Sequence, residues 1–144
     1  EIVSRDWSSD VCSSDLIRRG DAVLLLNLPG QTWCYTPGGR IATGESSREA
    51  LARELQEELG RPCPIGRPLL GGENFFTFRD CPIHEVCFYY EAELPGEAPA
   101  TTKDGEIVRW VLLAEFGALD LKPPFLKEHI LRPRAETTWV IHRD

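Results

Sequence analysis

The sequence lacks several features that would place it directly in a class of proteins. No apolar run among its 144 residues is long enough to span a membrane. Its first residues contain no basic region followed by an apolar run, as a signal peptide would. Lysine and arginine form no cluster and the net charge is −7, which argues against nucleic acid as the main partner. We therefore expect neither a membrane nor a nucleic acid as partner.

Paired metal-binding cysteines are also missing. The five cysteines include no CxxC pair and the three histidines are scattered, which argues against a zinc site. Free thiols without a secretory signal indicate a reducing compartment, so we expect a cytoplasmic protein. A homodimer is left open.

The first sixteen residues differ in composition from the rest. Arg5 to Leu16 read RDWSSDVCSSDL, with Ser and Asp throughout and no apolar period, which is typical of a flexible tail. The string also matches the translation of a common short-read sequencing adapter. We interpret residues 1–16 as an artefactual disordered tail, with a natural disordered tail as the alternative, and residues 17–144 as one domain. The tail has four acidic residues and one arginine, a net charge of −3, which leaves −4 for the domain. A first strand expected before Ile17 would then be missing.

The most informative stretch, residues 38–60, reads GGRIATGESSREALARELQEELG. Its two leading glycines permit a tight turn and a close backbone approach. Ser46 and Glu49 form an S-x-x-E capping box, which predicts the start of a helix, and Gly60 predicts its end. The apolar stripe of this helix consists of Leu51, Leu55 and Leu59.

Three carboxylates crowd one face of the predicted helix. Glu54, Glu57 and Glu58 fall within an arc of roughly 100°. Like-charged neighbours three or four residues apart cost about 0.2–0.5 kcal/mol each. Arg53 can pair with Glu57 at i,i+4. The remaining charge suits either a solvated surface, as is common for glutamate-rich faces, or a divalent cation that binds several carboxylate oxygens.

The wider spacing favours the cation. The segment fits the pattern GX5EX7REUXEEXGU, where U is a bulky apolar residue, from Gly39 through Glu45 and residues 53–58 to Gly60. It departs from the pattern only at the final position, Arg61. This pattern is the Nudix box, so the chain resembles the Nudix hydrolase family. The resemblance implies an α/β (α+β) fold, a Nudix-like α/β/α sandwich with a mixed central sheet.

The same resemblance implies a function. Family members hydrolyse the diphosphate linkage of a nucleoside diphosphate joined to another group, with Mg2+ as cofactor or Mn2+ in its place. A small nucleotide-type molecule would be the partner. By resemblance, the metal ligands are Glu54, Glu57 and Glu58; further catalytic residues are Arg53 and Glu106; the substrate-binding loop is Gly38, Gly39 and Arg40; and the structural supports of the box are Glu45 and Gly60.

The general base and the substrate stay open at this stage. Glu106 is the first candidate for the base outside the box and Glu85 the second, and for each an exposed strand carboxylate is the alternative. Phe75, Phe76 and Phe78 could stack on a base, although core packing is the commoner use. Phe76 and Phe78 stand where two substrate-specific subfamilies have proline and tyrosine, so no substrate is assigned beyond the class.

Two other hypotheses compete with the hydrolase. One is a regulator that binds nucleotides without cleaving them; such domains usually lose box glutamates, which are all present here. The other is a chain that folds poorly because its first strand is replaced.

The predicted strands cover residues 22–28, 33–36, 68–78, 83–94, 106–111 and 138–141, and the predicted helical segments cover residues 46–60, 113–116 and 123–130.

Overall fold

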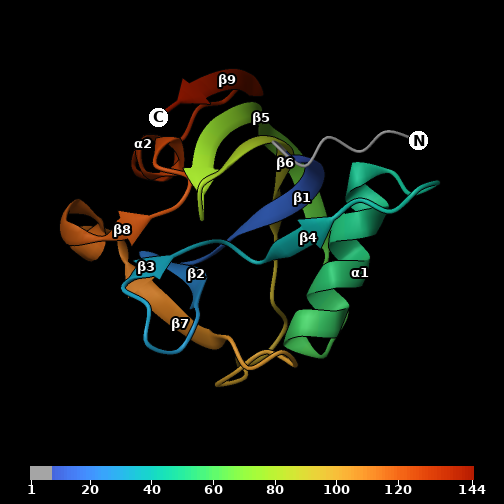
Figure 1. The fold of residues 1–144 in the computed structure, drawn as a ribbon. Coiled ribbons are helices and arrows are strands. Elements are labelled where there is room, and N and C mark those ends of the chain that lie inside the picture. The colour runs from blue at the N-terminus through green and yellow to red at the C-terminus, as the bar shows by residue number, and fades with distance from the viewer. Residues whose placement is uncertain (1–7) are drawn as a thin grey trace.

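The computed structural model describes residues 8–144, in which a seven-stranded mixed sheet lies between two helices (Figure 1). The strands follow the order β7-β2-β1-β6-β5-β9, with β4 paired to β1, and β3 and β8 form a separate two-stranded sheet. The strands are β1 (Ser8–Arg19), β2 (Ala22–Asn27), β3 (Trp33–Cys34), β4 (Gly38–Arg40), β5 (Ile65–Phe78), β6 (Cys81–Ala92), β7 (Ile107–Leu112), β8 (Asp120–Leu121) and β9 (Thr138–Arg143). The helices are α1 (Ser47–Leu59), the 3-10 helix η1 (Leu113–Ala118) and α2 (Phe125–Leu131).

The apolar run of β2 shows why the chain forms three layers. Val23 and Leu25 belong to one buried cluster, which includes residues of α2 and η1. Leu24 and Leu26 belong to another, which includes the leucine stripe of α1. Because successive side chains of a strand point to opposite faces, a run that is apolar on both faces needs cover on both. The predicted α/β/α sandwich with a mixed sheet is confirmed.

Local signals placed most element boundaries correctly. The capping box of α1 is formed, since the Ser46 side chain accepts a hydrogen bond from the backbone N of Glu49 and the Glu49 side chain accepts one from the backbone N of Ser46. Gly60 adopts the left-handed conformation, with φ of 76°, that ends the helix. Arg79 and Asp80 turn the long β5–β6 hairpin.

The expectation of a disordered tail is wrong for residues 8–16, which form most of β1. This strand pairs in parallel with β6 from Ser8 to Ile17 and antiparallel with β2 and β4, which places it in the middle of the sheet (Figure 1). Serine and aspartate disfavour strands, but pairing on two sides satisfies the backbone whatever the side chains are. The domain boundary at residue 17 therefore falls inside a strand, and the expected first strand is present. Residues 1–7 lie outside the described part of the chain.

The unusual composition of β1 has a local cost. Ser13 and Asp15 point toward the α1 side and are fully buried. Neither the Ser13 hydroxyl nor either Asp15 carboxylate oxygen has a hydrogen-bond partner within the described residues. Burial raises the pKa of Asp15 well above its ordinary value, and the nearby charge of Glu58 raises it further. A buried, unpartnered carboxyl group destabilises the folded state.

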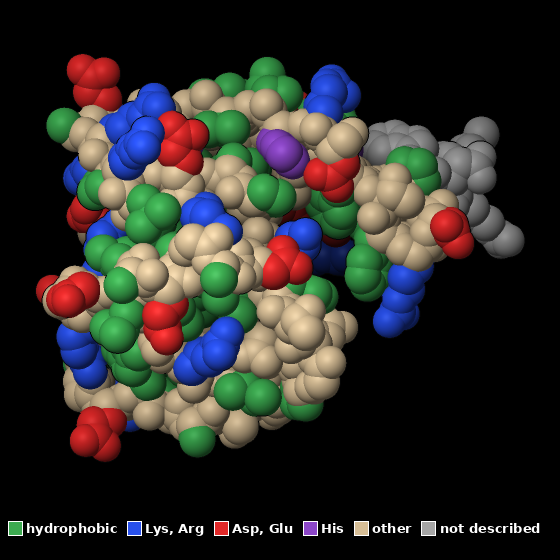
Figure 2. Space-filling view, turned by 90° about the vertical axis from the view of Figure 1, so that its left-hand side faces the viewer, with side chains coloured by type: hydrophobic (Ala, Val, Ile, Leu, Met, Phe, Trp, Pro, Cys, Tyr) green, Lys and Arg blue, Asp and Glu red, His purple; other side chains and the backbone are tan. Residues whose placement is uncertain are grey.

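Charge is distributed without a strong bias on the visible surface. On the face shown in Figure 2, lysine and arginine side chains alternate with acidic ones and form no continuous basic stripe. Among the described helices, none has the length and hydropathy needed to cross a membrane.

Replacing Asp15 with alanine should stabilise the protein. The substitution removes a buried polar group without partners, which is worth about 1–3 kcal/mol. Because the folded-state pKa of Asp15 is raised, the native chain holds a proton that the unfolded chain releases above about pH 4. The wild type therefore loses stability as the pH rises, and the advantage of Asp15→Ala should be larger at pH 7 than at pH 4. Urea unfolding at both values measures it.

The matched control is Glu93→Ala, which removes an exposed carboxylate just after β6. We expect it to change the free energy of unfolding little at either pH. If Asp15→Ala lowers the stability at pH 7, the carboxyl group has a partner and the burial argument fails.

Candidate active site

Arg53 on α1 holds the box together. Its Nε and one terminal nitrogen donate to the two carboxylate oxygens of Glu45, at 2.6 and 3.0 Å. Its other terminal nitrogen donates to Glu54 at 2.8 Å and lies 3.6 Å from a carboxylate oxygen of Glu57. The terminal nitrogen that donates to Glu45 also donates to the backbone carbonyl of Arg40, at 3.1 Å. One guanidinium thus connects the loop before α1 with two glutamates on the helix.

The carboxylate of Glu45, on the loop before α1, is ionised. The hydrogen bonds from Arg53, followed by one from the backbone N of Ala42, lower the pKa of Glu45 to about 2. Glu45 therefore keeps its negative charge at physiological pH and fixes the loop to α1, the place that the family resemblance implies for it.

The Gly38–Gly39 turn lies directly against the carboxylates. The backbone N of Gly38 donates to a carboxylate oxygen of Glu58, at 3.2 Å. A Cβ on Gly39 would collide with the carboxylate of Glu54, and one on Gly38 would collide with the backbone carbonyl of Ser13. With φ of 149°, Gly38 also has a backbone conformation that other residues rarely adopt. Gly38 therefore tolerates no side chain without strain, and a side chain at Gly39 would displace the Glu54 carboxylate.

Glu58 is the most perturbed carboxylate of the box. Burial raises its pKa most, the charge of Glu106 adds to this, the hydrogen bond from Gly38 opposes it, and Glu54 and Asp104 raise it further, to about 8. Several negative groups therefore converge where water is largely excluded. Such a site favours a bound cation, since a cation stabilises the charged form of every member.

Glu106 comes to this site from the segment that precedes the edge strand β7. It precedes β7, and its carboxylate accepts hydrogen bonds from the Tyr35 hydroxyl and, at 3.1 Å, from the Thr102 hydroxyl. The charge of Glu106 acts on Glu58. The chain thus brings together a residue of the long 95–105 loop, a residue before β7 and the box helix. Tyr35 and Thr102 had no role in the sequence interpretation, because only the fold shows that they hold Glu106.

Two other carboxylates, Glu57 and Glu85, are not among the groups that shift the pKa of Glu58. Glu57 is 53% exposed and pairs with Arg53 on the outer side of α1. Glu85, the second candidate for the base, lies on β6. Burial raises its pKa most, the hydrogen bond from Cys12 lowers it and the charge of Asp10 raises it, whereas the box glutamates have no part in the shift. Glu106 is therefore the better placed of the two candidate bases.

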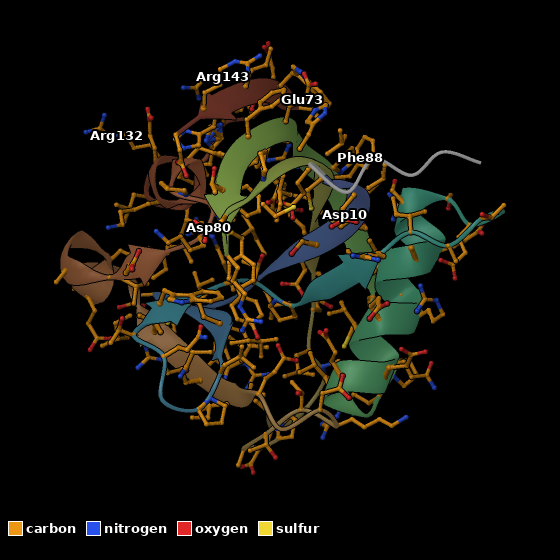
Figure 3. All side chains as sticks on the ribbon, viewed as in Figure 1. Asp10, Glu73, Asp80, Phe88, Arg132 and Arg143 are labelled. Atoms are coloured by element: carbon orange, nitrogen blue, oxygen red, sulfur yellow. The ribbon has the colours of Figure 1, made fainter. Side chains whose placement is uncertain are left out.

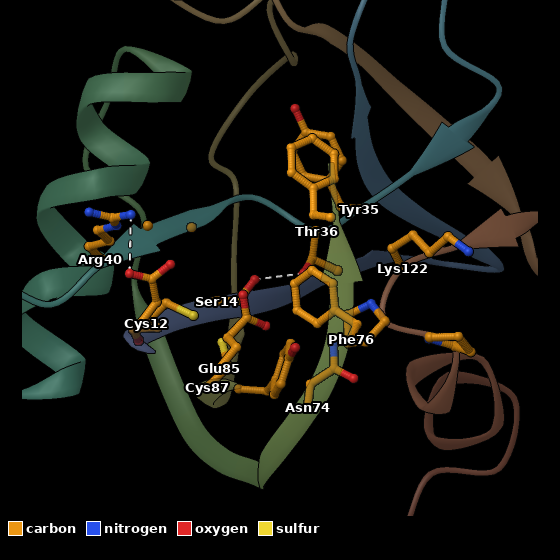
Figure 4. A pocket seen from close by; sticks show the side chains of 18 of the residues that line it. Cys12, Ser14, Tyr35, Thr36, Arg40, Asn74, Phe76, Glu85, Cys87 and Lys122 are labelled. Carbon is orange, nitrogen blue, oxygen red and sulfur yellow. Dashed lines mark hydrogen bonds and ion pairs between the residues drawn. The ribbon is translucent and has the colours of Figure 1, made fainter. Parts of the chain in front are cut away.

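A cavity of about 550 Å³ begins at the Gly38–Gly39 turn and extends over β1, β5 and β6 toward α2 (Figure 4). Its size falls within the range of small-molecule sites. Arg40 and Asp10, which lie 3.1 Å apart, form one wall, and Asp10 is on β1 (Figures 3 and 4). Further lining residues include Trp33, Tyr35, Thr36, Asn74, Phe76, Phe78, Glu85, Tyr89 and Lys122.

The three phenylalanines of β5 do not pack into the two buried clusters, so the expectation of core packing is wrong for them. Phe76 and Phe78 line the cavity, and Phe78 is exposed. Phe75 points to the other face, where it stacks on His84 at 4.2 Å between ring centroids and lies under Arg143. Alternation along the strand explains the separation of Phe75 from the other two.

The donor set fits a hard divalent cation. Glu54 and Glu58 present carboxylate oxygens beside the glycine turn, and the raised pKa of Glu58 marks uncompensated negative charge. The described residues contain no group of three His, Cys, Asp or Glu side chains already close enough to hold a metal ion together. The assignment of Glu54, Glu57 and Glu58 as a complete ligand set therefore stays a prediction.

Glu58 should make the apoprotein less stable as the pH rises. Its folded-state pKa of about 8 exceeds its ordinary value of 4.5, so its contribution to stability is complete below pH 4.5 and is lost as the pH rises to 8. In chelator, we expect Glu58→Gln to reduce the loss of unfolding free energy between pH 5 and pH 8. The reduction should exceed about 1.4 kcal/mol, the value of one pKa unit.

Glu57→Gln is the control, because Glu57 lies on the same helix but is largely exposed. Its pH dependence should follow that of the wild type. Parallel curves for the wild type and both variants would contradict the buried environment described for Glu58.

Comparisons with known proteins identify the family. A family model described as NUDIX domain matches residues 13–132. The uncharacterized Nudix hydrolase YvcI of Bacillus subtilis is 38% identical over 65 residues, 45% of this chain and 40% of that protein. The CTP pyrophosphohydrolase of Escherichia coli is 32% identical over 74 residues, 48% of this chain and 54% of that protein. These matches thus span about half of each relative or less.

Solved structures share the fold over nearly the whole chain. The MutT protein of Bacillus halodurans superimposes with a TM-score of 0.75 at 21% identity, over 93% of this chain and 89% of that one. The MutT protein of Methanosarcina mazei Go1 superimposes with a TM-score of 0.65 at 22% identity, over 90% and 95%. At 21% and 22% sequence identity, these superpositions show a shared fold and nothing about activity. The box geometry, the fold and the extent of the matching family model agree, and the chain belongs to the Nudix domain family.

Proposed function

We propose that this protein hydrolyses the diphosphate linkage of a nucleoside diphosphate joined to another group, with Mg2+ as its cofactor. The observation that carries the proposal is the Gly38–Gly39 turn. It touches Glu54 and Glu58 on one side and opens into the 550 Å³ cavity on the other. A nucleotide in the cavity would therefore place its phosphates beside the carboxylates. A nucleotide substrate is also what the name of one relative indicates, the CTP pyrophosphohydrolase of Escherichia coli.

The metal would be held by Glu54, Glu57 and Glu58. When bound, Mg2+ or Mn2+ supplies positive charge that offsets repulsion between these carboxylates and the anionic diphosphate and that polarises the phosphoryl oxygens. The glycine turn lets the phosphates approach the backbone, because no side chain lies between them. Arg53 keeps Glu54 and Glu57 oriented, and Arg40 at the cavity wall faces the same region with a further positive charge.

Glu106 is our candidate for the general base. Water attacks one phosphorus, the bridging P–O bond breaks, and the Glu106 carboxylate takes the proton that the water loses. Tyr35 and Thr102 each donate to a different oxygen of this carboxylate, which fixes its orientation. Each oxygen keeps a further lone pair for water.

A nucleotide-binding regulator is the alternative, and turnover separates the two. Activity should be measured as phosphate or nucleotide release from a panel of nucleoside diphosphate derivatives and nucleoside triphosphates, in Mg2+, in Mn2+ and in chelator. We expect turnover with metal and none with chelator. Glu57→Gln should abolish it while leaving thermal unfolding nearly unchanged, because it removes a ligand charge from an exposed position.

Glu97→Gln is the matched control, since Glu97 is an exposed loop carboxylate away from the box. It should keep wild-type turnover. Activity retained in Glu57→Gln would remove Glu57 from the ligand set, and a folded wild type inactive on the whole panel would favour the regulator.

The role of Glu106 has its own test. Glu106→Gln keeps an oxygen that can accept from Tyr35 or Thr102 but cannot take a proton from water, so kcat should fall about a hundredfold or more. Because binding groups are unchanged, KM should move little. Glu93→Gln serves as the control. A wild-type kcat in Glu106→Gln would reject its role as base.

A further inference from the structure

The sheet ends in an edge whose backbone groups are unpaired. Among the described residues β9 pairs only with β5, and Figure 1 shows it at the rim of the sheet. The backbone N of Asp144 donates to the carbonyl of Phe75, at 3.1 Å. Because the backbone groups of a strand alternate in direction, the even-numbered residues of β9 face β5, whereas Trp139, Ile141 and Arg143 direct their N–H and C=O groups outward. Within residues 8–144 these outward groups have no hydrogen-bond partner.

The side chains of the same three residues are exposed. Ile141 is 60% exposed and Trp139 is 54% exposed, and no other large apolar side chain that the structure describes reaches these values. The Trp139 ring lies against Gly71 of β5, where a Cβ would come within 2.5 Å of it, so the exposed ring has a defined position. The edge therefore presents apolar side chains and unpaired backbone groups side by side.

The other edge of the sheet is covered. The long 95–105 loop lies along the start of β7, where the backbone N of Val108 donates to the carbonyl of Ala100, at 3.0 Å. Proteins usually protect edges in this way, or with proline and lysine in the edge strand. The sequence of β9, TWVIHR, contains neither residue. An unprotected apolar edge favours the addition of another strand.

We propose that β9 pairs in antiparallel with β9 of a second copy of this chain, so that the sheet continues through a two-fold axis at Ile141. Outward backbone groups must meet outward groups, which sets Ile141 opposite Ile141 of the second copy and Trp139 opposite Arg143 of the second copy. Each such pair exchanges two hydrogen bonds, about six in all. An isologous contact of this kind closes as a dimer and leaves no further edge of β9 open.

Charge favours this register. Arg143 is the only residue of β9 that is charged at neutral pH irrespective of its surroundings, and it lies on the outermost part of the strand (Figure 3). A two-fold axis at Arg143 would place two guanidinium groups opposite each other, which destabilises the pairing. An axis at Val140 would set Arg143 opposite Thr137, outside the partner strand. With the axis at Ile141, each Arg143 meets an aromatic ring, a favourable partner for a cation.

The association should be reversible. One pair of six-residue strands buries less than the roughly 800 Å² per partner of a standard interface. Sedimentation velocity over about 5–500 μM protein should show the mass rising from 16.2 kDa toward twice that value. In the same range, hydrogen exchange should slow at the amides of Trp139 and Ile141, while the amide of Val140, which faces β5, should be unaffected.

Ile141→Lys tests the interface. The side chain is largely exposed, so the monomer should keep its fold, but two ammonium groups would lie opposite each other at the axis. We expect this variant to stay at 16.2 kDa throughout the concentration range. Leu112→Lys is the matched control, since Leu112 is 50% exposed at the end of β7 on the other edge of the sheet. It should associate as the wild type does.

Ile141→Cys tests the register. Hydrogen-bonded pairs of antiparallel strands have Cα atoms about 5.5 Å apart, within the range that a disulfide spans. With oxidised glutathione, the two introduced thiols should form one disulfide, releasing two molecules of reduced glutathione. A covalent dimer should then appear on a non-reducing gel. Leu112→Cys and the wild type, which has its own five cysteines, give the background.

Three results would overturn the proposal. A wild type that stays monomeric at every concentration would exclude the second copy and leave the edge to a strand of another protein. Equal association of Ile141→Lys and the wild type would place the dimer contact elsewhere on the molecule. A dimer in which Ile141→Cys forms no more covalent product than Leu112→Cys would exclude the two-fold axis at Ile141.

Discussion

The close approach of the Gly38–Gly39 turn to α1 is the constraint on which the site depends. The turn lies between the backbone of β1 and the carboxylates of Glu54 and Glu58, and a Cβ at either glycine would collide with one of these neighbours. Ser14 holds the turn from the β1 side, since its hydroxyl donates to the carbonyl of Pro37 at 2.6 Å. Arg53 holds the helix side through Glu45. The cavity and the charged site meet because both share this short segment.

That arrangement requires a sheet covered on both faces. The helix α1 can present its glutamates to the turn only because its leucines are buried against β1, β2 and β6. The helix α2 covers the opposite face, and Pro123 and Pro124 just before it line the cavity. One strand with apolar residues on both faces, β2, is thus the part of the sequence that commits the chain to this architecture.

Local signals in the sequence predicted the elements well where the cause was local. The capping box at Ser46 and the left-handed Gly60 depend on neighbouring residues, and the structure follows them. The strand β1 was missed for the opposite reason. Its serines and aspartates disfavour a strand, and the partners that hold it are distant in sequence, with residues 81–92 on one side.

The residues of the site likewise fall into those that the sequence predicts and those that only the fold reveals. The Nudix box is contiguous, so its fixed spacing identified Arg53 and the glutamates without a structure. Thr102 and Tyr35, which hold Glu106, lie on separate segments that only the fold brings together. No periodicity of one segment contains that information.

The position of β1 has a consequence for how such a domain can change over evolutionary time. Its backbone pairs with three strands, whereas Cys12 and Ser14 project into the cavity. An exchange of this strand for an unrelated segment keeps the ladder but gives the cavity a new wall, while α1 and its carboxylates stay in place. Substitution within β1 is therefore a route to new ligands that leaves the sequence of the box helix unchanged.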